Sequence, residues 1–409
     1  MLNKQKIAVI VPDGMADSEI AALGGRTPME AAKKPCMDLL ARGGICGMAS
    51  FIPEKMISDA SATANLAILG YNPKIYSKGR SPLEAASLGL IMRGRDTAFR
   101  CNLATLSEEE QIYGDKIIID HGADEISTEE ADILIKDLDR ELGSDKVRFF
   151  TGKSYRHIVL WEDYPGACDF TGPHDILTKR AGGYLPFGPG DICVRLMEKS
   201  YDLLNCHPVN SKRRAEKKRP ANSIWLWSPG TKPEIPAFEM KYGQKGSVVA
   251  FVDLIKGLGI YAGMNVAEVE GATGNFYTNY QNKAAAAIGE FEKGADFVFV
   301  HIEAPDECAH RKEIENKVKS IENIDEMIAA PLYDYLNSSF KDFKMLILPD
   351  HPTYLSTGAH SYDPVPFLAY KKGSEKKSKI TNFNEKSVSK NSDIFMQNGY
   401  ELLDFVFAQ

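Results

Sequence analysis

Residues 6–15 read KIAVIVPDGM, a short aliphatic run that ends directly in Pro-Asp-Gly. Such a run is typical of a buried parallel strand, and here Asp13 follows the carboxyl end of that strand. The same order returns at 296–307 (DFVFVHIEAPDE) and at 342–350 (DFKMLILPD). Ligand sites of open α/β sheets lie beyond the carboxyl ends of the strands. Three strands tipped by acids therefore predict one sheet with its polar ligands at one edge.

These strands come from both ends of the chain, which predicts a discontinuous domain with the middle of the chain inserted. We expect an α/β domain built from residues 1–95 and 236–409. The middle holds shorter strand-like runs, an acidic helix at 127–143 and much Pro/Gly punctuation, so we expect a smaller α+β cap domain at 96–235. Residues 28–44 are expected to form one helix, and residues 371–390 an exposed loop.

Bulk properties exclude several classes of protein. A formal net charge of -7 argues against a general nucleic-acid binder, which normally carries a basic excess. No apolar run approaches the ~18 residues that a membrane span needs. The seven cysteines are an odd number and include no Cys-x-x-Cys pair, which favours free thiols. The sequence begins with a strand-like run and not with a signal peptide, so we expect a cytoplasmic protein. The sequence does not indicate an oligomeric state.

Carboxylates and imidazoles follow the predicted strands. Asp306 and His310 are four residues apart and share one face of a helical turn, and Asp350-His351 directly follows a strand. Each pair alone is also compatible with an ordinary polar surface. Together they offer the ligands of zinc, manganese or a similar ion, which favours a site for two adjacent divalent metals. The candidate ligands are Asp13, Asp306, His310, Asp350, His351 and His360.

A serine stands at the start of a predicted helix in residues 58–70, SDASATANLAILG. Ser61 would be the N-cap or the first residue of that helix, and Ser58 is a rival candidate. A plain helix cap is one interpretation, since serine is a favoured N-cap residue. A nucleophile is the other, because a metal lowers the pKa of a hydroxyl that it binds, and a helix N-terminus attracts phosphate oxygens. The metal ligands favour phosphoryl chemistry.

Motifs along nearly the whole chain then indicate a family. They include VPDGMAD (11–17), ANLAILGYNP (64–73), GRSPLEAAS (79–87), RPANSIWLW (219–227), DLIKG (253–257), EGATGNFYTNY (270–280), HIEAPDE (301–307) and LPDHPT (348–353). With them the sequence resembles the archaeal-type cofactor-independent phosphoglycerate mutases of the alkaline phosphatase superfamily, from about residue 5 to residue 370.

This resemblance implies an alkaline-phosphatase-like three-layer α/β/α domain with an inserted transferase domain. It implies interconversion of 3-phosphoglycerate and 2-phosphoglycerate through a phosphoserine, with two Mn²⁺ ions (or Zn²⁺, Co²⁺ or Mg²⁺) and no 2,3-bisphosphoglycerate. One metal would be bound by Asp13, Ser61, Asp350 and His351, and the other by Asp306, His310 and His360. Lys256 would neutralise charge on the transferred group, and the substrate's anionic groups would be bound by Arg80, Arg156, Arg213 and, as a weaker match, Arg100.

The sequence departs from the family pattern in three places. Ala62 stands where the family has an acid after its serine, and the spacing from Met56 leaves both Ser61 and Ser58 open as the nucleophile. Glu125 stands where the family has a cap histidine, so His121 becomes the candidate acid/base group. The loop around His360 reads Thr-Gly-Ala-His-Ser instead of the usual Thr-His-Thr.

Two further functions are compatible with these departures. A metal-dependent phosphomonoesterase, or a mutase for another small phosphorylated acid, would fit the altered cap segment. A binding protein without activity would keep the fold alone, but the intact set of metal ligands argues against it. In either enzyme the expected partner is a small phosphorylated molecule, and neither nucleic acid nor membrane is expected.

Overall fold

The computed structural model describes residues 4–166, 168–375 and 378–409, without the side chains of Ser58 and Pro189. The chain divides into two compact units. The first unit comprises Met1–Ser77 and Glu234–Gln409, and the second unit comprises Lys78–Pro233. None of the helices in the described ranges is long and apolar enough to cross a membrane.

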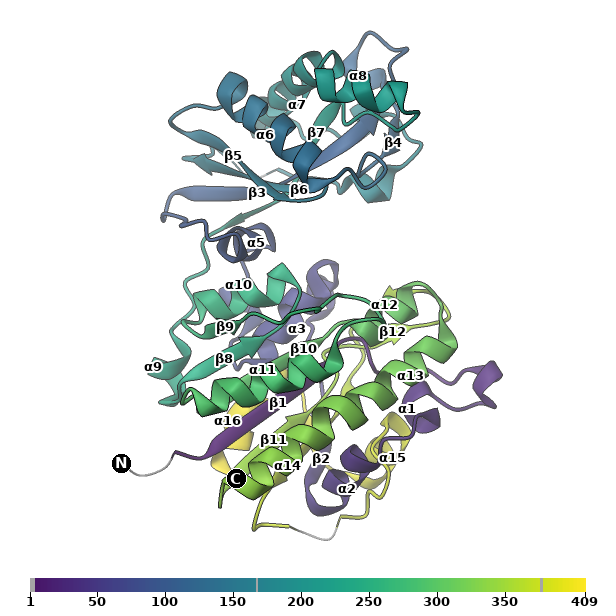
Figure 1. The fold of residues 1–409 in the computed structure, drawn as a ribbon, viewed down its shortest axis with the longest axis vertical. Coiled ribbons are helices and arrows are strands. Elements are labelled where there is room, and N and C mark those ends of the chain that lie inside the picture. Colours follow the sequence, from purple (N-terminus) through teal and green to yellow (C-terminus); the bar gives the residue numbers. More distant parts are fainter. Residues whose placement is uncertain (1–3, 167, 376–377) are drawn as a thin grey trace. The chain divides into compact units, whose positions relative to one another are not determined.

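A mixed sheet forms the centre of the first unit (Figure 1). The described residues give it eight strands in the order β15-β2-β14-β11-β1-β10-β8-β9, and only β14 runs antiparallel to its neighbours. In chain order the strands are β1 (Lys6–Pro12), β2 (Ile45–Ala49), β8 (Gly246–Val249), β9 (Asn265–Ala267), β10 (Phe297–Ile302), β11 (Phe343–Ile347), β14 (Val365–Lys371) and β15 (Phe395–Met396).

Strand β1 lies in the middle of this sheet because its aliphatic side chains are buried on both faces. Ile7 to Val11 have no exposed surface, as expected for a strand covered by helices on either side. Ala8 and Ile10 point into one core with residues of β10 and β11, and Val9 between them faces the opposite side of the sheet. The predicted acid-tipped strands β1, β10 and β11 are therefore adjacent and parallel.

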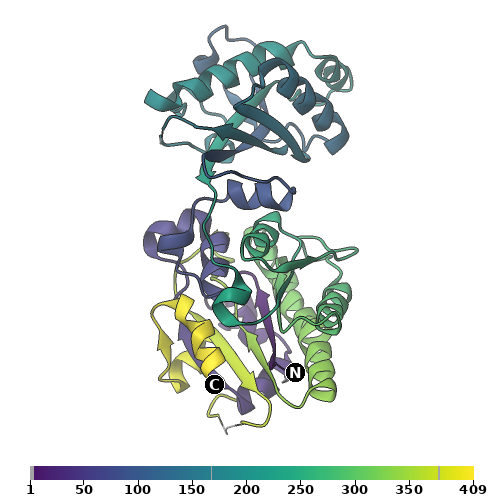
Figure 2. The same ribbon diagram turned by 90° about the vertical axis from the view of Figure 1, so that its left-hand side faces the viewer.

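Helices cover both faces of the sheet and complete three layers (Figures 1 and 2). One face packs against α2 (Pro35–Gly43), α11 (Tyr280–Glu292), α13 (Ile314–Ile324) and α14 (Ala330–Ser339), the last two joined by a π-helical turn, Asp325–Ala329. The other helices of this unit include α1 (Pro28–Ala31), α3 (Ala60–Ile68), α4 (Pro73–Tyr76), α9 (Phe238–Tyr242), α10 (Asp253–Tyr261), α12 (Ala304–His310), α15 (Glu385–Asn391) and α16 (Leu402–Ala408).

Two local predictions are wrong. Residues 28–44 form two helices, α1 and α2, because Pro35 has no N–H for a helix interior and begins the second helix instead. The predicted loop at 371–390 contains the start of α15, whose N-cap Asn384 accepts a hydrogen bond from the backbone N–H of Ser387. Residues 376–377 of that loop lie outside the described residues.

The second unit is an antiparallel sheet with helices on it. Its strands pair in the order β4-β3-β6-β5, with β7 also paired to β3. Its main elements are α5 (Ser81–Ser87), β3 (Asp96–Leu106), β4 (Ile118–Asp120), α6 (Thr128–Leu142), β5 (Val147–Lys153), β6 (Arg156–Glu162), α7 (Asp191–Asn205), α8 (Pro208–Ala215) and β7 (Ser223–Thr231). Helix α5 packs on β3, β6 and β7, which moves the start of this unit ahead of the expected residue 96.

The predicted fold class is confirmed. A three-layer α/β unit is assembled from both ends of the chain, and an α+β unit is formed by the middle. The parallel strands β1, β10 and β11 end at one edge of the sheet, where the candidate ligands were expected.

Candidate metal centre and phosphate site

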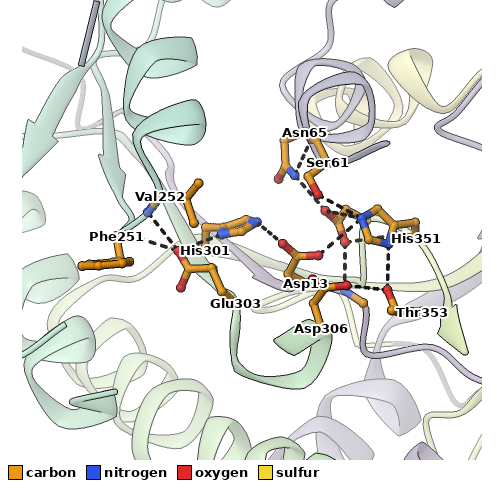
Figure 3. Close-up of polar contacts among 12 residues, drawn as sticks. Asp13, Ser61, Asn65, Phe251, Val252, His301, Glu303, Asp306, His351 and Thr353 are labelled. Atoms are coloured by element: carbon orange, nitrogen blue, oxygen red, sulfur yellow. Dashed lines mark hydrogen bonds and ion pairs between the residues drawn. The ribbon is translucent and has the colours of Figure 1, made fainter. Parts of the chain in front are cut away.

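Three predicted ligands converge on Ser61 at the carboxyl edge of the sheet (Figure 3). The Nε2 atom of His351 lies 3.4 Å from Oδ1 of Asp13 and 3.6 Å from Oδ2 of Asp350. The hydroxyl of Ser61 lies 3.2 Å from the same nitrogen. Asp13 follows β1, Asp350 and His351 follow β11, and Ser61 comes from α3. The sequence separates these residues by up to 338 positions, and the adjacent strands bring them together.

Backbone and amide donors fix the orientation of Asp350. Its Oδ1 accepts hydrogen bonds from the backbone N–H groups of Gly14, at 3.1 Å, and His351, at 2.9 Å. Its Oδ2 accepts one from the side-chain amide of Asn65, at 2.8 Å, and the same amide nitrogen donates to the carbonyl of Ser61. Asn65 therefore ties the first turn of α3 to the carboxylate of Asp350.

Gly14 is required by close approach at this edge. Its backbone is left-handed, with φ of 59°, and a Cβ here would lie 2.5 Å from Oγ1 of Thr353 and 2.7 Å from Oδ1 of Asp306. No larger residue fits without displacing these groups. The glycine of the opening Pro-Asp-Gly thus lets two parts of the site approach each other.

A second group of ligands lies beside the first. Oδ2 of Asp306 is 3.1 Å from Nε2 of His310, and Oδ1 is 3.3 Å from Nε2 of His360. The two histidine nitrogens are 2.9 Å apart. Asp306 and His310 belong to α12, whereas His360 ends the short strand β13 (Ala359–His360). All three side chains therefore point toward one place.

The spacing of both groups fits divalent metal ions. Two atoms each about 2.1 Å from one ion are about 3.0–3.4 Å apart at octahedral or tetrahedral angles, close to the observed ligand separations. Asp13, Asp350 and His351 form one such cluster, and Asp306 and His360 form another that also includes His351. The carboxylate-imidazole donor set suits Mn²⁺ or Zn²⁺.

The charges of the site are poorly balanced by the protein alone. Burial and the nearby carboxylates of Asp350 and Asp306 raise the pKa of Asp13. Burial also opposes the charge of Asp306, but hydrogen bonds from His310 and His360 hold its pKa well below the usual range. The hydrogen bond between His310 and Asp306 raises the pKa of His310 to about 9. Several buried carboxylates repel one another at this edge of the sheet, and a bound cation would offset that repulsion.

Ser61 occupies the second position of α3, one residue further into the helix than predicted. The helix begins at Ala60, and Asp59 is its N-cap residue. This helix consists mostly of small, buried residues, and its N-terminus lies beside the candidate metal ligands. The backbone N–H groups of a first turn lack partners within the helix and can bind phosphate oxygens. Ser58 lies in the preceding turn, and its side chain is outside the described part of the structure.

Sequence reasoning missed four side chains of this site. Asn65 and Thr353 orient the ligands, since Oγ1 of Thr353 donates to Asp306 at 2.6 Å and lies 3.2 Å from Nδ1 of His351. His301 lies 3.3 Å from Oδ2 of Asp13, and Glu303 lies next to His301 on its other side. His301 sits inside an aliphatic strand, where a histidine resembles a core residue, and only the neighbouring strand β1 reveals its partner.

Lys256 belongs to the first unit and lies in the first turn of α10. This helix packs beside α3, which carries Ser61, and beside β8. The ammonium group of Lys256 is 3.8 Å from Oε2 of Glu268 and is largely covered, with 20% of the side chain exposed.

Two of the predicted arginines meet at the ring of Trp227 in the second unit. The guanidinium groups of Arg80 and Arg100 lie 5.9 and 4.7 Å from the ring centre of Trp227. Both pair with Glu84, at 3.2 and 3.1 Å. Burial, together with the charges of Arg80 and Arg156, lowers the pKa of Arg100 to about 10, although Glu84 opposes this shift. The single carboxylate of Glu84 thus balances fewer charges than the group contains.

His121 and Arg156 belong to the same group through Tyr155. The His121 ring centre is 5.3 Å from that of Tyr155, and the guanidinium of Arg156 lies 5.0 Å over the Tyr155 ring. His174, which the sequence did not single out, lies between His121, at 6.3 Å, and Trp227, at 5.1 Å. Cations and imidazoles therefore gather over two aromatic rings.

Arg213 is not brought to this group. Its guanidinium is buried, with 2% exposed, and donates to Glu130 and to the backbone carbonyls of Ala123 and Arg219. It supports the turn at 123–125, where three consecutive residues have a left-handed backbone. Glu125, in the place of the family's cap histidine, lies exposed in this turn.

Comparisons with known proteins show which family the chain is similar to. A family model described as 2,3-bisphosphoglycerate-independent phosphoglycerate mutase matches residues 41–210. A protein of that name from Methanosarcina barkeri is 46% identical over 389 residues, covering 95% of this chain and 96% of its own. A solved structure from Pyrococcus horikoshii has 28% identity and a TM-score of 0.82, covering 100% of this chain and 97% of its own. A cofactor-independent phosphoglycerate mutase from Thermoplasma acidophilum has 26% identity and a TM-score of 0.68, with 99% of both chains covered.

Proposed function

Because the chain belongs to the 2,3-bisphosphoglycerate-independent phosphoglycerate mutase family, we propose that it interconverts 3-phosphoglycerate and 2-phosphoglycerate through a phosphoserine at Ser61. One observation carries this proposal. The Ser61 hydroxyl stands in the first turn of a helix, 3.2 Å from His351 and beside two clusters of metal-ligand atoms (Figure 3). No 2,3-bisphosphoglycerate is needed, since the protein's own serine carries the phosphoryl group.

Asp13, Ser61, Asp350 and His351 would hold one divalent ion, and Asp306, His310 and His360 would hold the other. Manganese is our choice of metal, since the donors are oxygen and imidazole nitrogen without thiolate. The ions would lower the pKa of the nucleophilic hydroxyl and neutralise phosphate charge.

The chain's own residues account for the remaining steps. Ser61 Oγ gives up its proton to solvent and attacks phosphorus, the bond from phosphorus to the glycerate oxygen breaks, and that oxygen takes a proton from His121. Lys256 and the N–H groups at the start of α3 stabilise negative charge on the phosphoryl oxygens. The reverse transfer to the other hydroxyl of the glycerate completes the reaction without consuming water.

The second unit supplies the substrate's other contacts in this proposal. Arg80, Arg100 and Arg156 would bind the carboxylate of the glycerate, and His121 would exchange protons with its hydroxyls. Arg213 would act indirectly, because its hydrogen bonds hold the turn after His121. The unit's role as the inserted transferase domain is part of this proposal, as is a reducing, cytoplasmic setting, which the seven free cysteines support.

The exposed Glu125 favours one alternative, a metal-dependent phosphomonoesterase or a mutase of another small phosphorylated acid. Without the family's cap histidine, water instead of glycerate would accept the phosphoryl group, or a different acid would be bound.

A ³¹P NMR assay with 3-phosphoglycerate and Mn²⁺, without 2,3-bisphosphoglycerate, separates these functions. The proposal predicts that the 2-phosphoglycerate signal grows until the two isomers reach equilibrium. Release of inorganic phosphate alone would overturn the mutase in favour of the phosphomonoesterase. Identical samples with excess EDTA serve as the control.

A further inference from the structure

A row of buried charged and polar side chains leads from helix α11 to the metal ligand Asp13 (Figure 3 shows its inner part). Nζ of Lys283 is 2.9 Å from Oε2 of Glu303 and donates to the backbone carbonyl of His301, at 2.8 Å. Oε1 of Glu303 is 3.4 Å from Nδ1 of His301. Nε2 of His301 is in turn 3.3 Å from Oδ2 of Asp13, whose other oxygen faces His351. Each member of the row therefore lies within ion-pair distance of the next.

The same carboxylate has a second set of contacts. Oε1 of Glu303 accepts hydrogen bonds from the backbone N–H groups of Phe251, at 3.3 Å, and Val252, at 3.1 Å. Val252 is the N-cap of α10, and Lys256 lies in the first turn of that helix. An anion at a helix N-terminus stabilises the helix start and fixes where it lies. Glu303 thus contacts the beginning of the segment that presents Lys256.

Burial of these charges needs a reason other than stability. The side chains of Lys283 and Glu303 are 0% and 5% exposed. A buried ion pair costs desolvation and is often no more stabilising than apolar residues of the same shape. Hydrogen-bonded neighbours of metal-binding carboxylates, in contrast, commonly set metal affinity. The position of this pair, between Asp13 and α10, favours a role in the site.

We propose that Glu303, held by Lys283, is a positioning residue that sets both halves of the phosphoryl-transfer site. Through His301 it orients Asp13 toward the metal, and through the N–H groups of Phe251 and Val252 it fixes the helix that carries Lys256. This inference rests on the proposed function, because it assigns the row to the metal and the lysine of that mechanism.

Three variants separate the two branches. Glu303→Gln keeps a side-chain oxygen that can accept hydrogen bonds, but it removes the negative charge that lies beside both Lys283 and His301. His301→Gln breaks only the branch to Asp13 and keeps the hydrogen bonds from the backbone N–H groups of Phe251 and Val252 to Glu303. Glu290→Gln is the matched control, since Glu290 is a buried carboxylate on α11 that binds Ser247, Asn265 and Lys293 in the same unit.

The experiment measures Mn²⁺ affinity by calorimetry on EDTA-stripped protein, and kcat and KM for 3-phosphoglycerate at saturating Mn²⁺. We expect Glu303→Gln to weaken Mn²⁺ binding about tenfold or more and to lower kcat more than it changes KM, even when the metal is saturating. His301→Gln should weaken Mn²⁺ binding to a similar extent but retain more of the wild-type kcat under saturating Mn²⁺. Glu290→Gln should match the wild type in both measurements.

Wild-type values of Kd and kcat in Glu303→Gln would overturn the inference, and so would equal losses in Glu290→Gln, which would indicate a general effect of removing a buried charge. If Glu303→Gln does not fold, unchanged Mn²⁺ affinity in folded His301→Gln overturns the branch to Asp13. A wild-type protein that binds no Mn²⁺, or makes no 2-phosphoglycerate, would instead overturn the proposed function and this inference with it.

Discussion

Replacement of Asn65 by alanine should weaken metal binding because this amide orients Asp350, one of the proposed metal ligands. The side chain of Asn65 is fully buried, and its Nδ2 donates to Oδ2 of Asp350 and to the carbonyl of Ser61, both at 2.8 Å. A hydrogen bond to a charged group contributes about 1.5–3 kcal/mol. At 1.4 kcal/mol per tenfold change, this corresponds to a loss of about 10- to 100-fold in affinity.

The assay is a calorimetric titration of Mn²⁺ into EDTA-stripped Asn65→Ala, with the wild type beside it. Asn222→Ala is the control, since Asn222 is equally buried and makes two hydrogen bonds to the backbone of Leu106 in the second unit. The control should lose folding stability but keep the wild-type Mn²⁺ affinity. A wild-type Kd in Asn65→Ala, or an equal loss in Asn222→Ala, would show that the hydrogen bonds of Asn65 do not set the metal affinity.

Three further predictions concern acid stability, substrate binding and the metals. Burial lowers the pKa of His157 to about 3, against 6.5 in the unfolded chain, so the unfolded state binds more protons and stability falls as the pH drops from 6.5 toward 3. Between pH 7 and pH 5 the protonation of this residue in the unfolded chain should lower the free energy of unfolding by about 2 kcal/mol. The loss in His157→Gln should be smaller by that amount, measured by urea unfolding with the fluorescence of the three tryptophans, all in the second unit. Equal losses of unfolding free energy in both proteins would contradict this prediction. Arg80→Gln should raise KM for 3-phosphoglycerate about tenfold or more in steady-state kinetics. Its Mn²⁺ affinity, measured by calorimetry, should stay unchanged. An unaltered KM would remove Arg80 from the proposed substrate site. EDTA should abolish mutase activity and lower the melting temperature, and both should return with Mn²⁺; activity that persists in EDTA would exclude the proposed metal centre.

Much of the candidate site could be predicted from the sequence because its candidate ligands lie where strands end. Asp13 and Asp350 each follow an aliphatic run, and the parallel arrangement of β1 and β11 brings them to one edge. The pair Asp306 and His310 needed only the spacing of one helical turn. These features are local, and the rule for open α/β sheets places them together.

Other features depend on contacts that no local pattern contains. His301 is a strand residue whose role depends on its partner Asp13, which follows the neighbouring strand. Helix α5 was expected in the first domain, but its buried Ala85 packs against Ala98 and Ile158 of the second unit, on strands that follow it in the sequence. Arg213 carries a charge typical of a phosphate ligand, yet it is buried in hydrogen bonds of its own unit.

Phosphorylation of Ser61 during turnover can be detected on the peptide that carries it. The protein is mixed with 3-phosphoglycerate and Mn²⁺, quenched in acid during turnover and digested with trypsin. The peptide 56–74, which contains Ser58 and Ser61, is then sequenced by mass spectrometry. We expect one phosphoryl group on Ser61, and none in Ser61→Ala, which should also lose activity. Phosphate on Ser58, or full mutase activity in Ser61→Ala, would contradict it.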